Sequence, residues 1–231
     1  MATATRSSPA WERYAWVAGI LFVVAVVTES AISLGIPINQ NDSAAKIASA
    51  LADHRTRLLV VEGVCVVYAA MFPIYLWKMY DLFLRSDAEG SSALGSLLLV
   101  GGVLFVALHA VSDVGIYGVL AGKLASFGAH HDQGISYTLY LMTYALDSVA
   151  DVFGSLFAFA AGVLVFRSGV LPRWLAWVSI LVAILLFLQA FGLGGLIASF
   201  GLVLDLIGFV LLLLFILVSS VILLRRGNAV R

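Results

Sequence analysis

Hydrophobic residues fall into five long blocks along this chain of 231 residues, and short polar segments separate the blocks. Each of the first four is about as long as a transmembrane helix, which needs about 20 mostly apolar residues. The fifth, residues 174–224, would measure about 76 Å as one helix at about 1.5 Å per residue, whereas a hydrocarbon core is about 30 Å thick. It must therefore fold back on itself, and the glycines between Gly192 and Gly201 mark the break.

The pattern predicts an all-α, polytopic membrane protein in which one domain, residues 1–231, forms a bundle of six transmembrane helices. The predicted spans are residues 14–35, 58–80, 94–120, 137–166, 174–194 and 199–224. The first apolar block is long enough to span the membrane and lies close to Met1, so we expect it to be retained as a helix. Cleavage as a signal peptide is the alternative.

A polar stretch between the first two spans predicts a short amphipathic helix in an extracellular loop. Residues 41–43 (Asn-Asp-Ser) can cap a helix that ends near His54. Ile47 and Leu51 lie four residues apart, so they share one face of that helix. We expect the helix to lie on the bilayer surface or over the mouth of the bundle.

Composition supports the membrane assignment. Hydrophobic residues make up 62% of the chain and charged residues 11%, with a mean hydropathy of +1.07. A soluble domain carries about a quarter charged residues, so this chain is too apolar to fold in water. Lys and Arg together number 13, as do Asp and Glu, and no basic excess points to nucleic acid. The single cysteine, Cys65, has no intramolecular disulfide partner.

Basic residues predict the orientation, because cytoplasmic loops are enriched in Lys and Arg. With the N-terminus inside, the inner segments hold Arg6, Arg13, Lys78, Arg85, Arg167, Arg173, Arg225, Arg226 and Arg231, and the outer loops hold Lys46, Arg55, Arg57 and Lys123. This asymmetry favours two cytoplasmic termini. All five tryptophans also lie at the inner ends of spans, as in an interfacial aromatic belt.

Ionisable residues inside the spans are the most informative feature for function. They are Glu29, Glu62, His109, Asp113, Asp147, Asp151 and Asp205. Counted from the inner end of each helix, all of them fall in the outer half of the membrane. Charged groups at such depth are costly and mark functional sites by default. We therefore predict a polar pocket that opens outward.

Spacing suggests which residues share the pocket. His109 and Asp113 lie four residues apart, as do Asp147 and Asp151, so each pair shares a helix face. Carboxylates this close cannot all ionise cheaply in a low dielectric, so either some are protonated or a cation neutralises them. The predicted ligand- or ion-binding set is Glu29, Glu62, His109, Asp113, Asp147 and Asp151.

Metal binding is one interpretation of this set. A histidine with several carboxylates is a ligand set for Zn²⁺ or Mn²⁺, with His109, Asp113 and Asp151 as the predicted ligands. Carboxylates alone would suit a proton or a hard cation instead. The shallower Asp113, Asp147 and Asp205 can also simply reach water, and the deeper groups can form interhelical hydrogen bonds.

Three segments resemble a family of uncharacterised bacterial multi-pass membrane proteins, the DUF4386 type. They are Trp11-Glu-Arg-Tyr-Ala-Trp-Val-Ala-Gly-Ile20, Arg55-Thr-Arg-Leu-Leu and Gly169-Val-Leu-Pro-Arg-Trp-Leu-Ala-Trp177. The resemblance implies a helical bundle in a bacterial inner (plasma) membrane. It implies no activity and no catalytic residues.

The function hypotheses span three classes. The first is a protein that binds or transports a cation, protons or a small cationic or amphiphilic molecule. The second is an intramembrane metal-dependent hydrolase acting on lipid, and the third is a non-catalytic accessory subunit.

We expect the lipid bilayer as partner and no nucleic acid. Small residues also permit packing into a homo-oligomer, namely Gly101, Gly102, Ala158, Gly162 and Gly208.

Overall fold

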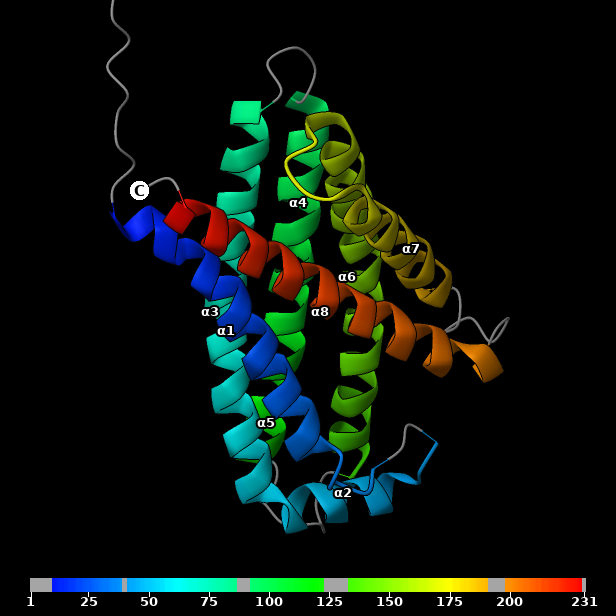
Figure 1. The fold of residues 1–231 in the computed structure, drawn as a ribbon. Coiled ribbons are helices and arrows are strands. Elements are labelled where there is room, and N and C mark those ends of the chain that lie inside the picture. The colour runs from blue at the N-terminus through cyan, green and yellow to red at the C-terminus, as the bar shows by residue number, and fades with distance from the viewer. Residues whose placement is uncertain (1–9, 39–40, 87–91, 123–132, 191–197, 230–231) are drawn as a thin grey trace, which may run out of the picture.

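The computed structural model describes residues 10–38, 41–86, 92–122, 133–190 and 198–229, and these residues contain helices and no strand (Figure 1). The helices are α1 (Ala10–Ser33), α2 (Ala44–Asp53), α3 (Arg55–Ser86), α4 (Ser92–His109), α5 (Tyr117–Gly122), α6 (Gln133–Ser168), α7 (Arg173–Ala190) and α8 (Ala198–Ala229), with a π-helical segment, η1 (Ala110–Ile116), between α4 and α5.

Six spans in this part of the chain are long and apolar enough to cross a membrane. α4, η1 and α5 together form one of them, Ala93–Gly122, and each of the other spans lies in one helix. The last apolar block forms two helices, α7 and α8, as its length predicted. The prediction of an all-α bundle with six transmembrane helices is confirmed, and the chain is an integral membrane protein.

The helices pack in a continuous series. α1 packs against α3 and α8, α4 against α3 and α6, and α7 against α6 and α8. Glycines permit the closest contacts: Gly101 of α4 faces the backbone of α6 at Phe153 and Phe157, and Gly162 of α6 faces Ala176 of α7. Close backbone approach of this kind is the usual way in which membrane helices associate.

The inner face of α3 carries a continuous apolar stripe with alternating steps of three and four residues. Its members are Leu58, Val61, Cys65, Tyr68, Phe72, Tyr75 and Met79, all of which are buried. Phe72 is at the centre of the bundle, where its ring lies 5.0 Å from that of Phe22 and 5.6 Å from those of Phe105 and Phe157. This stripe fixes the rotation of α3 and thereby determines which of its residues face the interior.

The short helix α2 lies across one end of the bundle (Figure 1). Ser43 caps its N-terminus by accepting a hydrogen bond from the backbone N–H of Lys46. Ile47 and Leu51 are buried and pack with Leu120 and Tyr140. The predicted helix over the bundle mouth is therefore present, and its extracellular orientation stays a prediction.

Gly101 offers a test of the α4–α6 contact. A Cβ added there would lie 2.7 Å from the backbone N of Phe157 and 2.9 Å from the backbone O of Phe153. Real Cβ atoms do not approach so closely, so α4 has to move away from α6. We expect Gly101→Ala to lower the free energy of unfolding by about 1–3 kcal/mol, measured by thermal unfolding in lipid nanodiscs.

Gly63 provides the matched control, since no described atom lies within 4 Å of a Cβ added at this position of α3. Gly63→Ala should be neutral or stabilise by up to about 1 kcal/mol, because alanine is the better helix former. Equal effects of the two substitutions would contradict the packing described for Gly101.

Candidate functional site

A cavity of about 430 Å³ lies inside the bundle at the end that α2 covers. Residues from α1, α3, α4, η1, α5, α6, α7 and α8 line it, so the site depends on the whole fold. One part of the lining is polar and the other is aromatic or aliphatic. The volume lies within the range of about 300–1,000 Å³ that is typical of sites for small molecules.

Four carboxylates from three elements line the cavity: Glu29 of α1, Asp113 of η1, and Asp147 and Asp151 of α6. Glu62 does not line it. It follows Val61 on α3, so it is rotated by about 100° from the buried stripe, and its carboxylate faces Gly118. The side chain of Asp205 lies outside the described residues.

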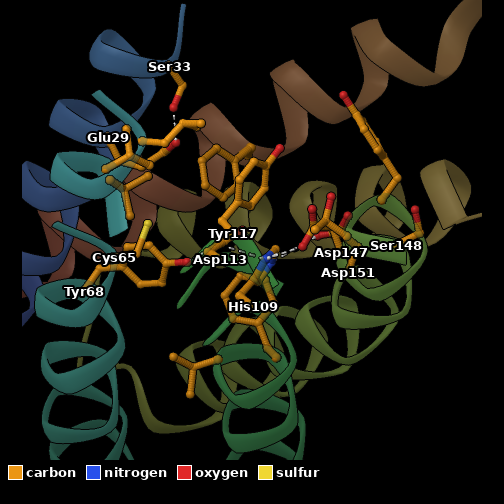
Figure 2. Close-up of a pocket in the computed structure, with 18 of the residues that line it drawn as sticks. Glu29, Ser33, Cys65, Tyr68, His109, Asp113, Tyr117, Asp147, Ser148 and Asp151 are labelled. Atoms are coloured by element: carbon orange, nitrogen blue, oxygen red, sulfur yellow. Dashed lines mark hydrogen bonds and ion pairs between the residues drawn. The ribbon is translucent and has the colours of Figure 1, made fainter. Parts of the chain in front are cut away.

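His109 is at the centre of the acidic cluster (Figure 2). Its Nδ1 lies 3.3 Å from Oδ1 of Asp147 and 3.9 Å from Oδ2 of Asp113, and its Nε2 lies 3.9 Å from Oδ1 of Asp151. The imidazole therefore has two carboxylates at one nitrogen and one at the other. Both pairs predicted from four-residue spacing, His109 with Asp113 and Asp147 with Asp151, line the same cavity.

The polar groups around His109 are largely buried, and burial of polar groups without hydrogen bonds costs free energy. The side chain of Asp151 is 5% exposed and that of His109 17%. In the described part of the chain, Nε2 of His109 and Oδ1 of Asp147 are buried atoms with no hydrogen bond. The 3.3 Å approach of Asp147 to Nδ1 thus lacks hydrogen-bond geometry. Buried polar atoms without a partner usually signal a functional role or a bound species.

Neighbouring side chains hold the cluster in place. The hydroxyl of Tyr68 donates a hydrogen bond to Oδ2 of Asp113. The ring of Phe105 packs edge-on against the imidazole of His109, with centroids 4.7 Å apart. The hydroxyl of Ser112 donates to the backbone O of Thr143 at 3.4 Å and so ties η1 to α6. Asp113 and Asp147 lie on these two elements.

The π-helical turn that carries Asp113 was not predicted. It begins directly after His109 and replaces the regular helix that the apolar pattern indicated for residues 94–120. Such turns are rare and occur frequently at functional sites.

Tyr68 was also missed as a site residue, although the sequence carried a signal for it. It lies three residues after Cys65 and seven after Val61, on the stripe of α3 that faces the interior. A hydroxyl on an otherwise apolar stripe needs a partner when it is buried, and the acids of the neighbouring helices supply one.

Glu29 lies apart from the cluster formed by His109, Asp113, Asp147 and Asp151, which we call the histidine cluster. Figure 2 shows it with Ser33 on one side of the cavity, and Asp147 and Asp151 on the other. Its Oε1 accepts a hydrogen bond of 2.6 Å from Ser33, and its Oε2 one of 3.3 Å from Ser30. The cavity therefore has two acidic sides.

The histidine cluster has the composition of a cation site. One ligand atom each from His109, Asp113 and Asp147 can be chosen so that all lie within 4.8 Å of one another. Imidazole nitrogen with carboxylate oxygen suits divalent metals such as Zn²⁺ and Mn²⁺.

Comparisons of the chain with models of protein families, with curated proteins and with solved structures find no match. The resemblance to the DUF4386 type stays a prediction, and the function has to be inferred from the site alone.

Two tyrosines of α3 test the electrostatics of the cluster. Tyr68 donates to a carboxylate, whereas the hydroxyl of Tyr75 is paired with that of Ser219 at 2.8 Å. Hydrogen bonds to charged groups contribute about 1.5–3 kcal/mol and those between neutral groups about 0.5–1.5 kcal/mol. We expect Tyr68→Phe to destabilise the protein more than Tyr75→Phe in chemical unfolding. A larger effect of Tyr75→Phe would contradict the stronger hydrogen bond that we assign to Tyr68 and Asp113.

Proposed function

We propose that this integral membrane protein binds a divalent metal ion, Zn²⁺ in the first place, through His109, Asp113 and Asp147. The observation that carries the proposal is the convergence of their three ligand atoms within 4.8 Å inside a membrane-spanning bundle. The residues come from α4, η1 and α6, so the fold brings them together from separate turns of the chain.

The distances suit a metal of this size. Ligands about 2.0 Å from a tetrahedral Zn²⁺ lie about 3.3 Å from one another. Nδ1 of His109 is 3.3 Å from Oδ1 of Asp147 and 3.9 Å from Oδ2 of Asp113. All three ligand atoms lie within 4.8 Å of one another, so the side chains would move closer together around an ion.

Charge favours a cation at the same place. None of the described residues that line the cavity is Lys or Arg, whereas four are acidic. Ionised carboxylates in a low dielectric are costly unless they are paired or coordinate a metal. A divalent ion would balance the charges of Asp113 and Asp147 and leave His109 neutral, which is the form that binds metals.

The proposed ligand set differs from the predicted one in one residue. The sequence favoured Asp151 as the second carboxylate, whereas Asp147 is the acid of α6 on the Nδ1 side of His109. Asp151 faces Nε2 and fits the role of the outer carboxylate that orients a metal-binding imidazole. It is a positioning residue in this proposal.

Glu62 has no part in this metal set, and because it does not line the cavity, the proposal does not include it among the binding residues. Transport and lipid hydrolysis, the bacterial inner membrane and the cytoplasmic termini stay predictions as well.

Elemental analysis of the protein purified in nanodiscs after equilibration with Zn²⁺ tests the proposal. We expect about one equivalent of zinc in the wild type and strong loss in His109→Ala and in Asp147→Asn, because each removes a ligand. Asp151→Asn should keep the site and weaken its affinity about 10- to 100-fold, measured by competition with a chelator.

His54→Ala is the matched control, since His54 caps the C-terminus of α2 and does not line the cavity. It should retain the zinc of the wild type. A wild-type protein without stoichiometric zinc or manganese, or a loss in His54→Ala equal to that in His109→Ala, would overturn the proposal.

A further inference from the structure

The cavity is much larger than a metal site requires. A metal ion with one water needs only a few tens of Å³, since one water occupies about 30 Å³ in the liquid, whereas the cavity measures about 430 Å³. Beyond a metal site, the cavity therefore has room for an organic molecule. Glu29 lines a second part of the cavity, with Tyr117 between it and the histidine cluster in Figure 2.

Glu29 supplies the charge in this second part. Its carboxylate accepts hydrogen bonds only from Ser30 and Ser33 of its own helix, and no ion pair involves it in the described part of the chain. If a metal balances Asp113 and Asp147, the charges of Asp151 and Glu29 remain. Asp151 faces Nε2 of His109, whereas Glu29 lies on the other side of the cavity. Glu29 lies within the membrane-spanning segment Tyr14–Ser33, where a carboxylate favours a cationic partner.

The walls around Glu29 are apolar. Phe22, Val26, Ile36, Val61 and Phe209 line the cavity together with it. Such walls suit a hydrocarbon chain, and tyrosine rings nearby suit an ammonium group through cation–π contacts. A phosphate group has no Lys or Arg to bind among the described lining residues, so a phospholipid head fits poorly.

The helices α1 and α8 form one side of the cavity. The two helices cross where Gly19 meets Ser220, and they diverge from there toward the end of the bundle that α2 covers (Figure 1). Val26 and Glu29 of α1 lie beyond this crossing, as does Phe209 of α8, and all three line the cavity. Both helices therefore contribute to the lining of the cavity.

From these observations we infer that the cavity also binds a phosphate-free, long-chain amine from the bilayer. Its ammonium group pairs with Glu29 and its alkyl chain lies along the apolar wall of α1, α3 and α8. The inference extends the proposed function, on which it rests because the metal takes up Asp113 and Asp147. The metal and the amine then occupy the cavity together.

Direct binding of radiolabelled hexadecylamine tests the inference, with the full-length protein in phosphatidylcholine nanodiscs and saturating Zn²⁺. We expect about one equivalent of amine per chain in the wild type. Glu29→Gln should weaken binding about tenfold or more, the loss of one charged hydrogen bond. Val26→Phe should weaken it too, because the larger side chain fills the apolar part of the cavity.

Glu62→Gln is the matched control, because Glu62 is an acid in a neighbouring span that does not line the cavity. It should bind hexadecylamine like the wild type. Hexadecanol and hexadecanoic acid should compete weakly, since neither carries a positive charge. Equal competition by hexadecanol, or an equal loss in Glu62→Gln and Glu29→Gln, would overturn the inference. Butylamine that competes as well as hexadecylamine would show a soluble cation site instead and would overturn it too.

Zinc content measured on the same samples separates the two proposals. Glu29→Gln should keep its zinc, so loss of amine with retained zinc supports both sites. An absence of zinc in the wild type, with amine binding that still depends on Glu29, would overturn the metal proposal alone. Displacement of hexadecylamine by Zn²⁺ would show that both use the same carboxylates and would overturn the inference.

Discussion

Neutralisation of carboxylates inside a membrane is the constraint on which the rest of this structure depends. A charged side chain near the bilayer centre costs at least about 2.5 kcal/mol, and four acids line one cavity in this bundle. The fold meets this constraint by placing three of the acids around His109 and by supplying hydroxyl donors, such as Tyr68 for Asp113 and Ser33 for Glu29. In the proposed metal-bound state, a divalent cation completes the compensation.

Packing elsewhere in the bundle makes this gathering possible. The aromatic cluster of Phe22, Phe72, Phe105 and Phe157 holds α1, α3, α4 and α6 together next to the cavity. Close contact at Gly101 brings α4 against α6, and this contact places His109 opposite Asp147 and Asp151. The apolar interior is therefore the support that sets the distances in the polar site.

Much of the fold could be predicted from the sequence. The transmembrane spans are long apolar runs, and α2 shows the four-residue spacing of an amphipathic helix. The rise per residue also predicted acids of several helices at a similar height, and four of these acids line one cavity. The rotation of each helix about its own axis could not be predicted from the sequence. A shift of one position along a helix turns the direction of the side chain by about 100°. Glu62 shows this well, because Val61 beside it lines the cavity and Glu62 does not.

The sequence also did not display which acid of α6 lies nearer to Nδ1 of His109. Asp147 and Asp151 lie on the same face of α6, and the packing of α4 against α6 together with the orientation of the imidazole decides which nitrogen of His109 each acid approaches. The π-helical turn could not be predicted either, since no residue type in Ala110–Ile116 indicates it. Contacts between helices, which a single sequence does not display, determine these details.

X-ray absorption spectroscopy of the zinc-loaded protein is the sharpest test of the proposed metal site, because it reports the atoms bound to the metal. We predict one imidazole nitrogen at about 2.0–2.1 Å together with carboxylate oxygens at about 2.0–2.2 Å. In Asp147→Asn any remaining zinc should lose the signal of this shell. A shell with sulfur at about 2.3 Å, or one made only of oxygen with no imidazole, would contradict metal binding through His109 and its neighbouring carboxylates.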